Sequence, residues 1–450
     1  MSARKCTSAI SKFYDGKSVF ITGATGFVGK VLIEKLLYRC SNIGNVYVLI
    51  RNTAQQNVNQ RLEGLLQSSA FTRLRKEKPQ ALAKIVPVAG DITLPNLGIE
   101  QRDEETLLEN VAIVFNIAAS INFVAPLQHN FTLNVEGTER MLDLSRRVKR
   151  LEGFVHFSTA FCNYDLRELE EVVYPPPAKR EDVYKFLQNN SNSKELKKLL
   201  NGHPNTYTFT KALAETLVVE KRGTMPTAII RPAIVMPSLA EPMEGWIDNW
   251  QGPIALMTAA AKGRLRGMLG SDHYITDLVP VDYVANMAAI VATKCTNEVA
   301  VYHCCTSTVN PLTCRDTVTY FASEGVKNGF NDKYAPPPHV TFFKHAFIVD
   351  AFAFLTQTVP AYCLDLLQIA KRKKTRYVKG LALMTTLRKA MQPFIGRSWQ
   401  FRSERAQELI RALPPADRRL FPCDPAHIQW RPYLAGCFRG AQKHLMKKQK

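Results

Sequence analysis

The sequence predicts an α/β protein built on a doubly wound parallel sheet, followed by a smaller, mostly α-helical C-terminal domain. Three observations support this fold class. Short apolar runs alternate with helical patterns through the first 330 residues, and a glycine-rich turn directly follows the first run. The remainder of the chain is rich in helical patterns and basic residues. At 450 residues, the chain is long enough to bury one large core and a smaller appendage.

Six apolar runs have the length and composition of buried strands. They are SVFI at 18–21, VYVLI at 46–50, IVPVA at 85–89, VAIVFNI at 111–117, FVHF at 154–157 and TAII at 227–230. Helical patterns separate the runs, so consecutive strands are joined by crossovers and should be parallel. Together with the glycine turn, this alternation is typical of a Rossmann-type sheet with helices on both faces.

The expected domain boundaries follow from changes in composition. Residues 1–330 should form the sheet domain, with substrate-pocket insertions at 165–204 and 236–275, because ligands bind at the carboxyl ends of parallel strands. The segment 331–345 begins with NDKYAPPPH and is predicted to be a linker. A hydrophobic segment then spans 346–370, and a basic helical domain spans 371–450.

Composition and charge exclude several classes of protein. An apolar fraction of 46% and a charged fraction of 22% are those of an ordinary folded protein. The ten cysteines form neither a CxxC pair nor a Cys/His cluster, so we expect reduced thiols facing the cytosol and no metal site. The net charge is +20, and residues 371–450 hold 20 Lys and Arg against 4 Asp and Glu. This basic tail suits an anionic membrane surface; it contains no recognised nucleic-acid module, so no nucleic-acid partner is expected.

The hydrophobic segment 346–370 is long enough to span a bilayer. Asp350 and Asp365 argue against a simple spanning helix, since an acid near its centre costs about 2.5–3.5 kcal/mol. Because Pro360 should break the helix, we expect an in-plane or re-entrant hairpin seated in one leaflet. A pair of buried helices packed on the rest of the protein is the alternative.

The glycine-rich turn TGATGFVG at 22–29 opens a helical pattern, VLIEKLLYRC. Gly23 permits the tight turn, Gly26 lets backbone amides approach a pyrophosphate, and Gly29 allows the helix to pack closely on the strand. A second strand follows at the spacing of a βαβ unit, so we interpret the turn as a dinucleotide site. The expected cofactor contacts here are Thr22, Gly23, Thr25, Gly26, Phe27 and Gly29.

The residues after the second strand indicate which dinucleotide binds. Arg51 and Asn52 stand where an NAD enzyme places Asp or Glu against the ribose 2′-hydroxyl. A guanidinium suits a 2′-phosphate, which a carboxylate would repel. We therefore predict NADPH rather than NADH, with Arg51 as the main determinant.

Two later strand ends supply further expected cofactor contacts. Asp91 and Ile92 follow the third strand, where a side chain can reach the edge of the adenine ring of the cofactor. Ala118 and Ala119 lie in NIAAS after the fourth strand, where small side chains let the backbone lie against the cofactor.

A candidate catalytic pair lies in YTFTK, where Tyr207 and Lys211 are four residues apart on one helix face. A phenol titrates near pH 10, and a nearby ammonium stabilises the phenolate and brings its pKa toward the working range. The pair follows a strand that ends in Ser158 and Thr159, either of which supplies a hydroxyl. Ser158 is the favoured residue and Thr159 its rival.

These motifs together resemble the extended short-chain dehydrogenase/reductases. The resemblance implies that Tyr207 is the acid–base residue and that Lys211 binds the nicotinamide ribose and lowers the pKa of the tyrosine. It also implies that the Ser or Thr hydroxyl polarises the substrate carbonyl, and that Asn134 in NVEGT shapes the site.

Longer segments resemble the alcohol-forming fatty acyl-CoA reductase family. They are RLEGLLQSSAFTRL (61–74), RPAIVMPSLAEPMEGWIDNWQGP (231–253), MLGSDHYITDLVPVDYVAN (268–286), VPAYCLDLL (359–367) and FPCDPAHIQWRPYLAGCFRGAQKHL (421–445). In that family the RP-x-IV segment, here residues 231–235, lies beside the nicotinamide. This adds Arg231, Pro232, Ile234 and Val235 to the expected cofactor contacts. The resemblance implies two NADPH-dependent reductions of a long-chain acyl-CoA, through a bound aldehyde, to the primary alcohol.

The expected location is the cytosolic face of a membrane, reached through 346–370 and the basic tail. The endoplasmic reticulum is favoured, since Lys447 to Lys450 resemble a dilysine retrieval signal, and the peroxisome is the alternative. Two rival functions share parts of the pattern. One is another extended reductase, such as a hydroxysteroid dehydrogenase or a sugar-nucleotide epimerase; the other is a catalytically inactive membrane-associated homologue. Neither the oligomeric state nor the acyl chain length is predicted.

Overall fold

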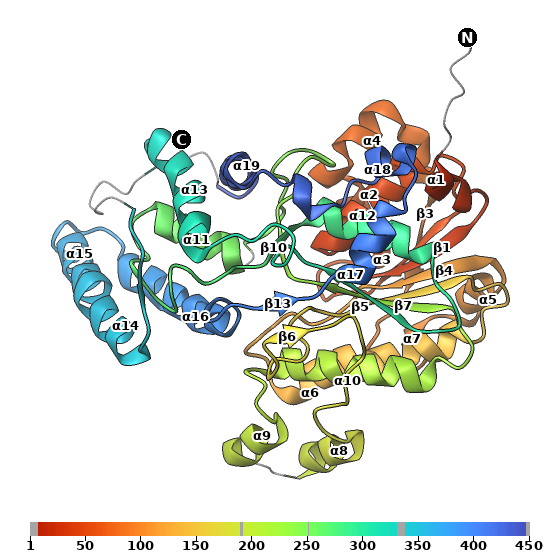
Figure 1. Ribbon diagram of the computed structural model, residues 1–450, viewed down its shortest axis with the longest axis horizontal. Helices are drawn as coiled ribbons and strands as arrows, with labels where there is room; N and C mark the ends of the chain where they lie inside the picture. Colours follow the sequence, from red (N-terminus) through yellow and green to blue (C-terminus); the bar gives the residue numbers. More distant parts are fainter. Residues whose placement is uncertain (1–7, 190–191, 251, 331–337, 447–450) are drawn as a thin grey trace. The chain divides into compact units, whose positions relative to one another are not determined.

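The computed structural model describes residues 8–189, 192–250, 252–330 and 338–446, and it divides into two compact units (Figure 1). The first unit contains the described residues up to 243, together with 279–305 and 401–425. The second contains 244–278, 306–400 and the described residues from 426 onward. Each unit is therefore assembled from separate stretches of the chain.

A seven-stranded parallel sheet forms the centre of the first unit, in the order β11-β7-β5-β4-β1-β2-β3. Its strands are β1 (Ser18–Thr22), β2 (Val46–Ile50), β3 (Ile85–Ala89), β4 (Val111–Asn116), β5 (Gly153–Phe157), β7 (Thr227–Pro232) and β11 (Ala300–Cys304). All residues of β1, β2, β4, β5 and β7 are buried, which is why these strands are continuously apolar rather than alternating. The predicted fold class and all six predicted strands are confirmed.

Helices cover both faces of this sheet, with α2 and α12 on one face and α7 and α10 on the other (Figure 1). The helices of the first unit are α1 (Ala9–Phe13), α2 (Phe27–Arg39), α3 (Val58–Leu66), α4 (Thr72–Glu77), α5 (Gln101–Asn110), α6 (Leu127–Phe131), α7 (Gly137–Ser145), α8 (Arg180–Gln188), α9 (Ser193–Leu199), α10 (Thr206–Lys221), α12 (Val281–Ala292), α17 (Glu404–Arg411) and α18 (Pro415–Leu420). Neighbouring β1 and β4 end at the edge where a doubly wound sheet binds its ligand.

The edge strand β11 was not among the predicted strands. Its sequence AVYHC contains His303, whose polarity obscures the apolar pattern. The buried imidazole is satisfied by tertiary hydrogen bonds, from Arg231 Nη1 (3.1 Å) and with the carbonyl oxygen of Arg402 (2.6 Å). Because those partners are 72 and 99 residues away along the chain, the local sequence gave no sign of them.

The second unit is mainly helical. It contains α11 (Gly252–Ala261), α13 (Cys314–Lys327), α14 (Ala346–Ala353), α15 (Val359–Ala370), α16 (Tyr377–Ile395) and α19 (Trp430–His444), with a small parallel pair of strands, β9 (Gly267–Leu269) and β12 (Thr341–Phe343). Helix α13 packs against both α11 and α19. A mostly helical second part is as predicted.

The predicted domain boundaries differ from these units. Most of the predicted insertion 236–275 belongs to the second unit, whereas 401–425 belongs to the first. In the first unit, the amide of Arg402 donates to the carbonyl of Leu169 (2.8 Å), and the Glu171 carboxylate accepts from the amides of Arg405 (2.6 Å) and Ala406 (3.2 Å) at the start of α17. Residues 331–337 of the predicted linker lie outside the described residues, as does the dilysine segment at 447–450.

The hydrophobic segment forms one continuous helix, Ala346–Ala370, so the predicted break at Pro360 is wrong. A π-helical stretch, Phe354–Thr358, immediately precedes the proline. A π-bulge widens the helix and accommodates a residue that lacks an N–H and would clash with the preceding turn. Only 11% of the most apolar window of this helix is buried within the described structure.

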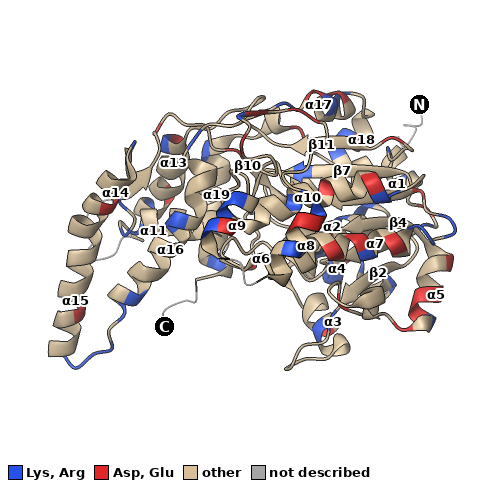
Figure 2. Cartoon of the chain, turned by 90° about the horizontal axis from the view of Figure 1, so that it is seen from below, with Lys and Arg blue, Asp and Glu red and all other residues tan. Residues whose placement is uncertain are grey.

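The hairpin instead forms between this helix and α16. The Asp365 carboxylate accepts from the amides of Arg376 (2.9 Å), Tyr377 (3.1 Å) and Val378 (3.0 Å) and so caps the start of α16. Asp350 pairs with Arg388 of α16 at 2.6 Å. Figure 2 shows α14 and α15 mainly in the colour of uncharged residues, with basic residues in the loop that follows α15.

Candidate active site

The glycine turn lies at the carboxyl end of β1 and is packed too tightly for side chains. Gly23 has φ +71°, and a Cβ placed on it would lie 2.9 Å from the amide nitrogen of Ala118. A Cβ on Gly29 would lie only 2.3 Å from the carbonyl oxygen of Gly23. Gly26 precedes α2 and provides no side-chain cap, and the N-terminal end of a helix attracts an anionic ligand. This cradle fits a dinucleotide pyrophosphate.

Thr22 and Phe27 support the turn rather than line it. The fully buried Thr22 hydroxyl donates to Asn116 Oδ1 (3.0 Å) and accepts from the amides of Ile117 (3.1 Å) and Ala118 (3.0 Å). It thereby fixes the loop after β4 against the end of β1. Phe27 is also buried, on the core side of α2. Ala118 and Ala119 are half-buried in the loop after β4, and their small side chains would let the backbone lie against a cofactor.

The residues that follow β2 carry positive charge. Arg51 is exposed, and Asn52 uses its side-chain oxygen to accept from the amide of Val58 at 3.0 Å, which shapes the loop. A second guanidinium, Arg61 of α3, donates to the Arg51 carbonyl oxygen at 2.6 Å. Arg61 was not among the predicted site residues, although it is the first residue of the RLEGL segment.

Asp91 and Ile92 make contacts within the protein itself. Asp91 Oδ1 accepts from the amide (2.9 Å) and hydroxyl (2.8 Å) of Thr93. Ile92 is buried, and its side chain packs against Gly137 of α7, where an added Cβ would lie 2.8 Å away. The contact of Ile92 with a cofactor is therefore limited to its backbone.

Helix α10 begins after Asn205, whose side chain accepts from the amide of Thr208 (2.9 Å). This cap sets the start of the helix and places Tyr207 in its first turn. The Thr159 hydroxyl lies near the phenol and opposes the rise of its pKa, and the Tyr207 ring packs edge-on against Phe123, with 5.4 Å between centroids. The structure thus brings Thr159 near the tyrosine, whereas the buried Ser158 hydroxyl makes no hydrogen bond within the described residues.

Burial sets the protonation of both members of the pair. It raises the pKa of Tyr207 to about 12, and the nearby Thr159 hydroxyl opposes that shift. It lowers the pKa of Lys211 to about 8, and the charge of Glu215 opposes that shift. Lys211 Nζ donates to the carbonyl oxygen of Phe157, at the end of β5. Near pH 7 the site therefore holds a neutral phenol and a mostly protonated amine.

Asn134 and His156 complete the buried polar framework. Asn134 lies in the π-helical stretch Thr132–Glu136, where its side chain accepts from the amide of Ser120 (2.8 Å) and donates to the Thr210 hydroxyl (3.0 Å). It ties the loop after β4 to α10. His156 lies beside Lys211; burial, reinforced by that positive charge, holds its pKa well below the usual range.

Arg231 is committed to the protein itself. Nε and Nη2 pair with the Glu215 carboxylate (2.9 and 2.6 Å), and Nη2 also donates to the Val172 carbonyl (2.7 Å). Nη1 donates to the Glu170 carbonyl and to His303 (3.1 Å each). All five N–H groups are used within the protein, so a contact of Arg231 with the cofactor is left to its backbone.

The residues that follow Arg231 fit a cofactor contact better. Pro232 ends β7 and is buried, whereas Ile234 and Val235 of β8 (Ile234–Met236) are half-buried. Half-buried aliphatic side chains can pack on a nicotinamide ring. Within the described residues, no cluster of three or more His, Cys, Asp or Glu side chains is arranged to hold a metal ion.

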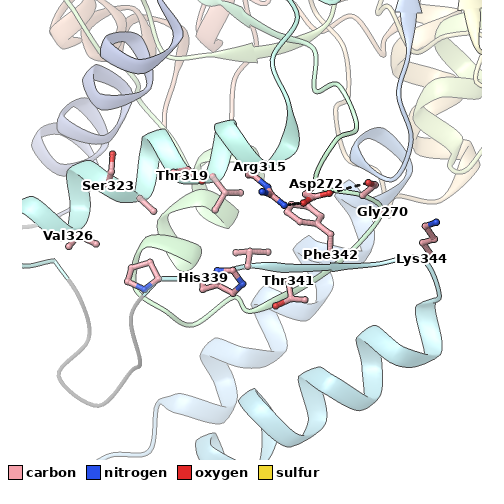
Figure 3. Close-up of a pocket in the computed structure, with 15 residues that line it drawn as sticks. Gly270, Asp272, Arg315, Thr319, Ser323, Val326, His339, Thr341, Phe342 and Lys344 are labelled. Atoms are coloured by element: carbon pink, nitrogen blue, oxygen red, sulfur yellow. Dashed lines mark hydrogen bonds and ion pairs between the residues drawn. The ribbon is translucent and has the colours of Figure 1, made fainter.

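The second unit contains a separate cavity of about 680 Å³ (Figure 3). It lies between α13 and the β9/β12 pair, and the Asp272–Arg315 ion pair crosses its wall, as the dashed lines show. Phe342 points toward Arg315 from the strand side, and His339 and Thr341 also line the cavity (Figure 3). None of the predicted site residues lines it.

Comparison with known proteins identifies relatives over the whole chain. Two models described as male sterility protein match it, an NAD-binding one over residues 21–288 and a second one over 356–448. Fatty acyl-CoA reductase 1 of Rattus norvegicus is 35% identical over 448 residues, which cover 97% of this chain and 86% of the relative. Fatty acyl-CoA reductase 2 of Bos taurus is 32% identical, covering 98% and 87%.

Solved structures support the fold alone. The reductase domain of a nonribosomal peptide synthetase from Mycobacterium tuberculosis superposes with a TM-score of 0.65 at 18% identity, covering 95% of this chain and 92% of that one. The terminal R domain of the myxalamid pathway gives a TM-score of 0.63 at 19% identity, covering 96% and 92%.

Proposed function

The chain belongs to the fatty acyl-CoA reductase family, and we propose that it reduces a long-chain fatty acyl-CoA to the primary alcohol with release of CoA. The observation that carries this proposal is the arrangement of Tyr207 against Thr159, with Lys211 one turn further along α10, beside a glycine turn that fits a dinucleotide. The relatives, named as fatty acyl-CoA reductases, match both units of the chain.

We assign NADPH as the nicotinamide cofactor. The glycine turn and the uncapped start of α2 would hold its pyrophosphate, and the exposed Arg51 would meet the 2′-phosphate. When bound, NADPH supplies the hydride that each reduction adds to the carbonyl carbon. The residues that surround the substrate carbonyl do the remaining chemistry.

In the first reduction, hydride addition converts the thioester carbonyl into a tetrahedral oxyanion. The hydroxyls of Thr159 and Tyr207 donate hydrogen bonds to that oxygen, and donors of this kind stabilise the charge most where water is excluded. The C–S bond then breaks, CoA leaves as the thiolate, and the carbonyl re-forms as an aldehyde. We therefore assign the polarising hydroxyl to Thr159 rather than to Ser158.

In the second reduction, the aldehyde oxygen becomes an alkoxide and takes the proton of Tyr207, which gives the alcohol. A phenol with a pKa of about 12 holds this proton until the alkoxide forms. The ammonium of Lys211 then stabilises the phenolate that remains. Asn134 is a positioning residue, since it fixes the loop after β4 to α10.

We also propose that helix Ala346–Ala370 lies on the cytosolic face of a membrane, with the endoplasmic reticulum favoured over the peroxisome. Large apolar side chains are exposed along it, including Phe347, Leu355 and Leu366, and the run KRKK follows directly at 371–374. An apolar helix beside basic residues binds anionic membrane surfaces. Replacing Phe347, Leu355 and Leu366 with Gln should abolish co-flotation with phosphatidylserine vesicles; full retention would contradict this placement.

The central test measures products and binding together. Purified protein is incubated with NADPH and lauroyl-, palmitoyl- or stearoyl-CoA, and the lipids are analysed by mass spectrometry. We expect fatty alcohol, and no turnover by Tyr207→Phe despite unchanged NADPH binding. Thr159→Val should lose turnover by about 100-fold, the effect of removing one oxyanion donor, while Ser158→Ala should lose much less. Absence of both alcohol and aldehyde from the wild-type reaction would refute the proposed function.

A further inference from the structure

Arg61 connects the two parts of the nucleotide site that lie on different elements. Its Nη1 donates to the carbonyl oxygen of Arg51 at the end of β2 (2.6 Å), and its Nη2 donates to the Thr25 hydroxyl in the glycine turn (3.4 Å). The position of α3 therefore sets a half-buried guanidinium between the second strand and the turn that follows the first.

The two arginines form a like-charged pair. Neither Arg51 nor Arg61 is ion-paired with a carboxylate within the described part of the chain, and the segment 51–62 contains no acidic residue. Burial, and then the charge of Arg51, lowers the pKa of Arg61. Two adjacent cations without a counter-ion repel each other, and an anion placed between them removes that repulsion.

The location indicates which anion binds. In a βαβ dinucleotide site the adenosine ribose lies at the end of the second strand, next to the glycine turn that holds the pyrophosphate. Resting on the assignment of NADPH above, we propose that Arg61 is a second specificity-determining residue that binds the 2′-phosphate together with Arg51. Through the Thr25 hydroxyl it also couples recognition of the 2′-phosphate to the glycine turn.

A purely structural role for Arg61 makes a different prediction. If the guanidinium served only to hold the loop after β2 through the Arg51 carbonyl, its loss would weaken every adenosine ligand alike. A residue that binds the 2′-phosphate must instead distinguish ligands that differ only in that group.

The experiment uses isothermal titration calorimetry of the full chain with 2′,5′-ADP and 5′-AMP, without substrate. The wild type should bind 2′,5′-ADP more tightly than 5′-AMP. Arg61→Gln should weaken the affinity for 2′,5′-ADP about 10- to 100-fold, which is the effect of losing a charged hydrogen bond. It should change the affinity for 5′-AMP about twofold or less. The affinity of Arg61→Lys for 2′,5′-ADP should fall between those of the wild type and Arg61→Gln, because an ammonium keeps the charge but loses the bidentate geometry. The exposed Arg150 precedes the amino end of β5, whereas the nucleotide site lies at the carboxyl ends of the strands. Arg150→Gln therefore removes the same charge and should change neither affinity.

The outcomes separate this inference from the cofactor assignment. A wild type with no preference for 2′,5′-ADP overturns the NADPH assignment, and this inference with it. A wild type with the preference, combined with an Arg61→Gln protein that keeps it or loses both ligands equally, overturns the role of Arg61 alone. Thermal unfolding verifies that Arg61→Gln is folded; if it is not, Arg61→Lys decides by the same ratio of affinities.

Discussion

The glycine turn offers a sharp test of packing, because a single methyl group at Gly29 has nowhere to go. Its Cβ would lie 2.3 Å from the Gly23 carbonyl oxygen and 2.9 Å from the Cα of Ala24, and real Cβ contacts are essentially never shorter than 3.0 Å. Both neighbours are backbone atoms, so no side-chain rotation relieves the overlap. Gly23 cannot retreat either, since it already lies against Ala118.

Gly29→Ala must therefore push the turn away from α2. Overpacking of this kind costs about 1–3 kcal/mol, and the short backbone contacts place this case at about 3 kcal/mol. The midpoint of thermal unfolding should fall by roughly 6 °C. NADPH affinity, measured by quenching of intrinsic fluorescence, should fall at least about tenfold, because the pyrophosphate amides move with the turn.

Gly64 provides the matched control. It lies inside α3, and a Cβ added there would have no atom within 4 Å. Gly64→Ala should raise the free energy of unfolding by about 0.5–1 kcal/mol and leave NADPH affinity unchanged. A Gly29→Ala protein with the unfolding midpoint and NADPH affinity of the wild type would refute the reasoning about the turn.

Three further predictions concern buried charge. Because the pKa of Lys211 is about 8, kcat/KM for acyl-CoA should decline as the pH rises through 8 and the ammonium is lost; a profile that stays flat to higher pH would contradict its role. Arg231→Met should lower the free energy of unfolding in urea by about 3–5 kcal/mol, since it leaves the Glu215 carboxylate buried and unpaired, and Arg231→Met with Glu215→Leu should recover most of the loss. Burial raises the pKa of Glu171 to about 7, so the folded state binds the Glu171 proton more tightly than the unfolded state does. The contribution of Glu171 to the free energy of unfolding should therefore increase as the pH falls from 7 toward 4.5. Glu171→Gln should remove that increase, and an unchanged pH dependence of stability in this variant would contradict the raised pKa.

Much of the catalytic unit could be predicted from the sequence. Six strands of the seven-stranded sheet were predicted from continuous apolar runs, which a parallel sheet covered on both faces requires. The glycine turn could be interpreted as a dinucleotide site because each glycine is needed where neighbouring backbone or ligand atoms leave no room for a side chain. The spacing of Tyr207 and Lys211 similarly follows from the helical repeat, and the family match confirms the resemblance to fatty acyl-CoA reductases.

Other features of the structure were not predicted from the sequence. The sequence gives no indication that the Arg231 side chain is bound by Glu215 and by two carbonyls of the 165–204 insertion. The break at Pro360 was predicted from helix rules, but a preceding π-helical stretch absorbs the proline. Asp350 was counted as an obstacle to an apolar helix, but Arg388 pairs with it.

The sequence by itself determined the strands, the glycine turn and the YxxxK pair, because each is encoded by residues within one helix or strand and the turn beside it. Only the tertiary structure decided that Thr159 meets Tyr207, that Arg61 joins Arg51, and that 401–425 packs in the catalytic unit. Local rules depend on backbone geometry, which repeats along any chain. The choice among side chains depends on burial and on hydrogen bonds between segments that only folding brings together.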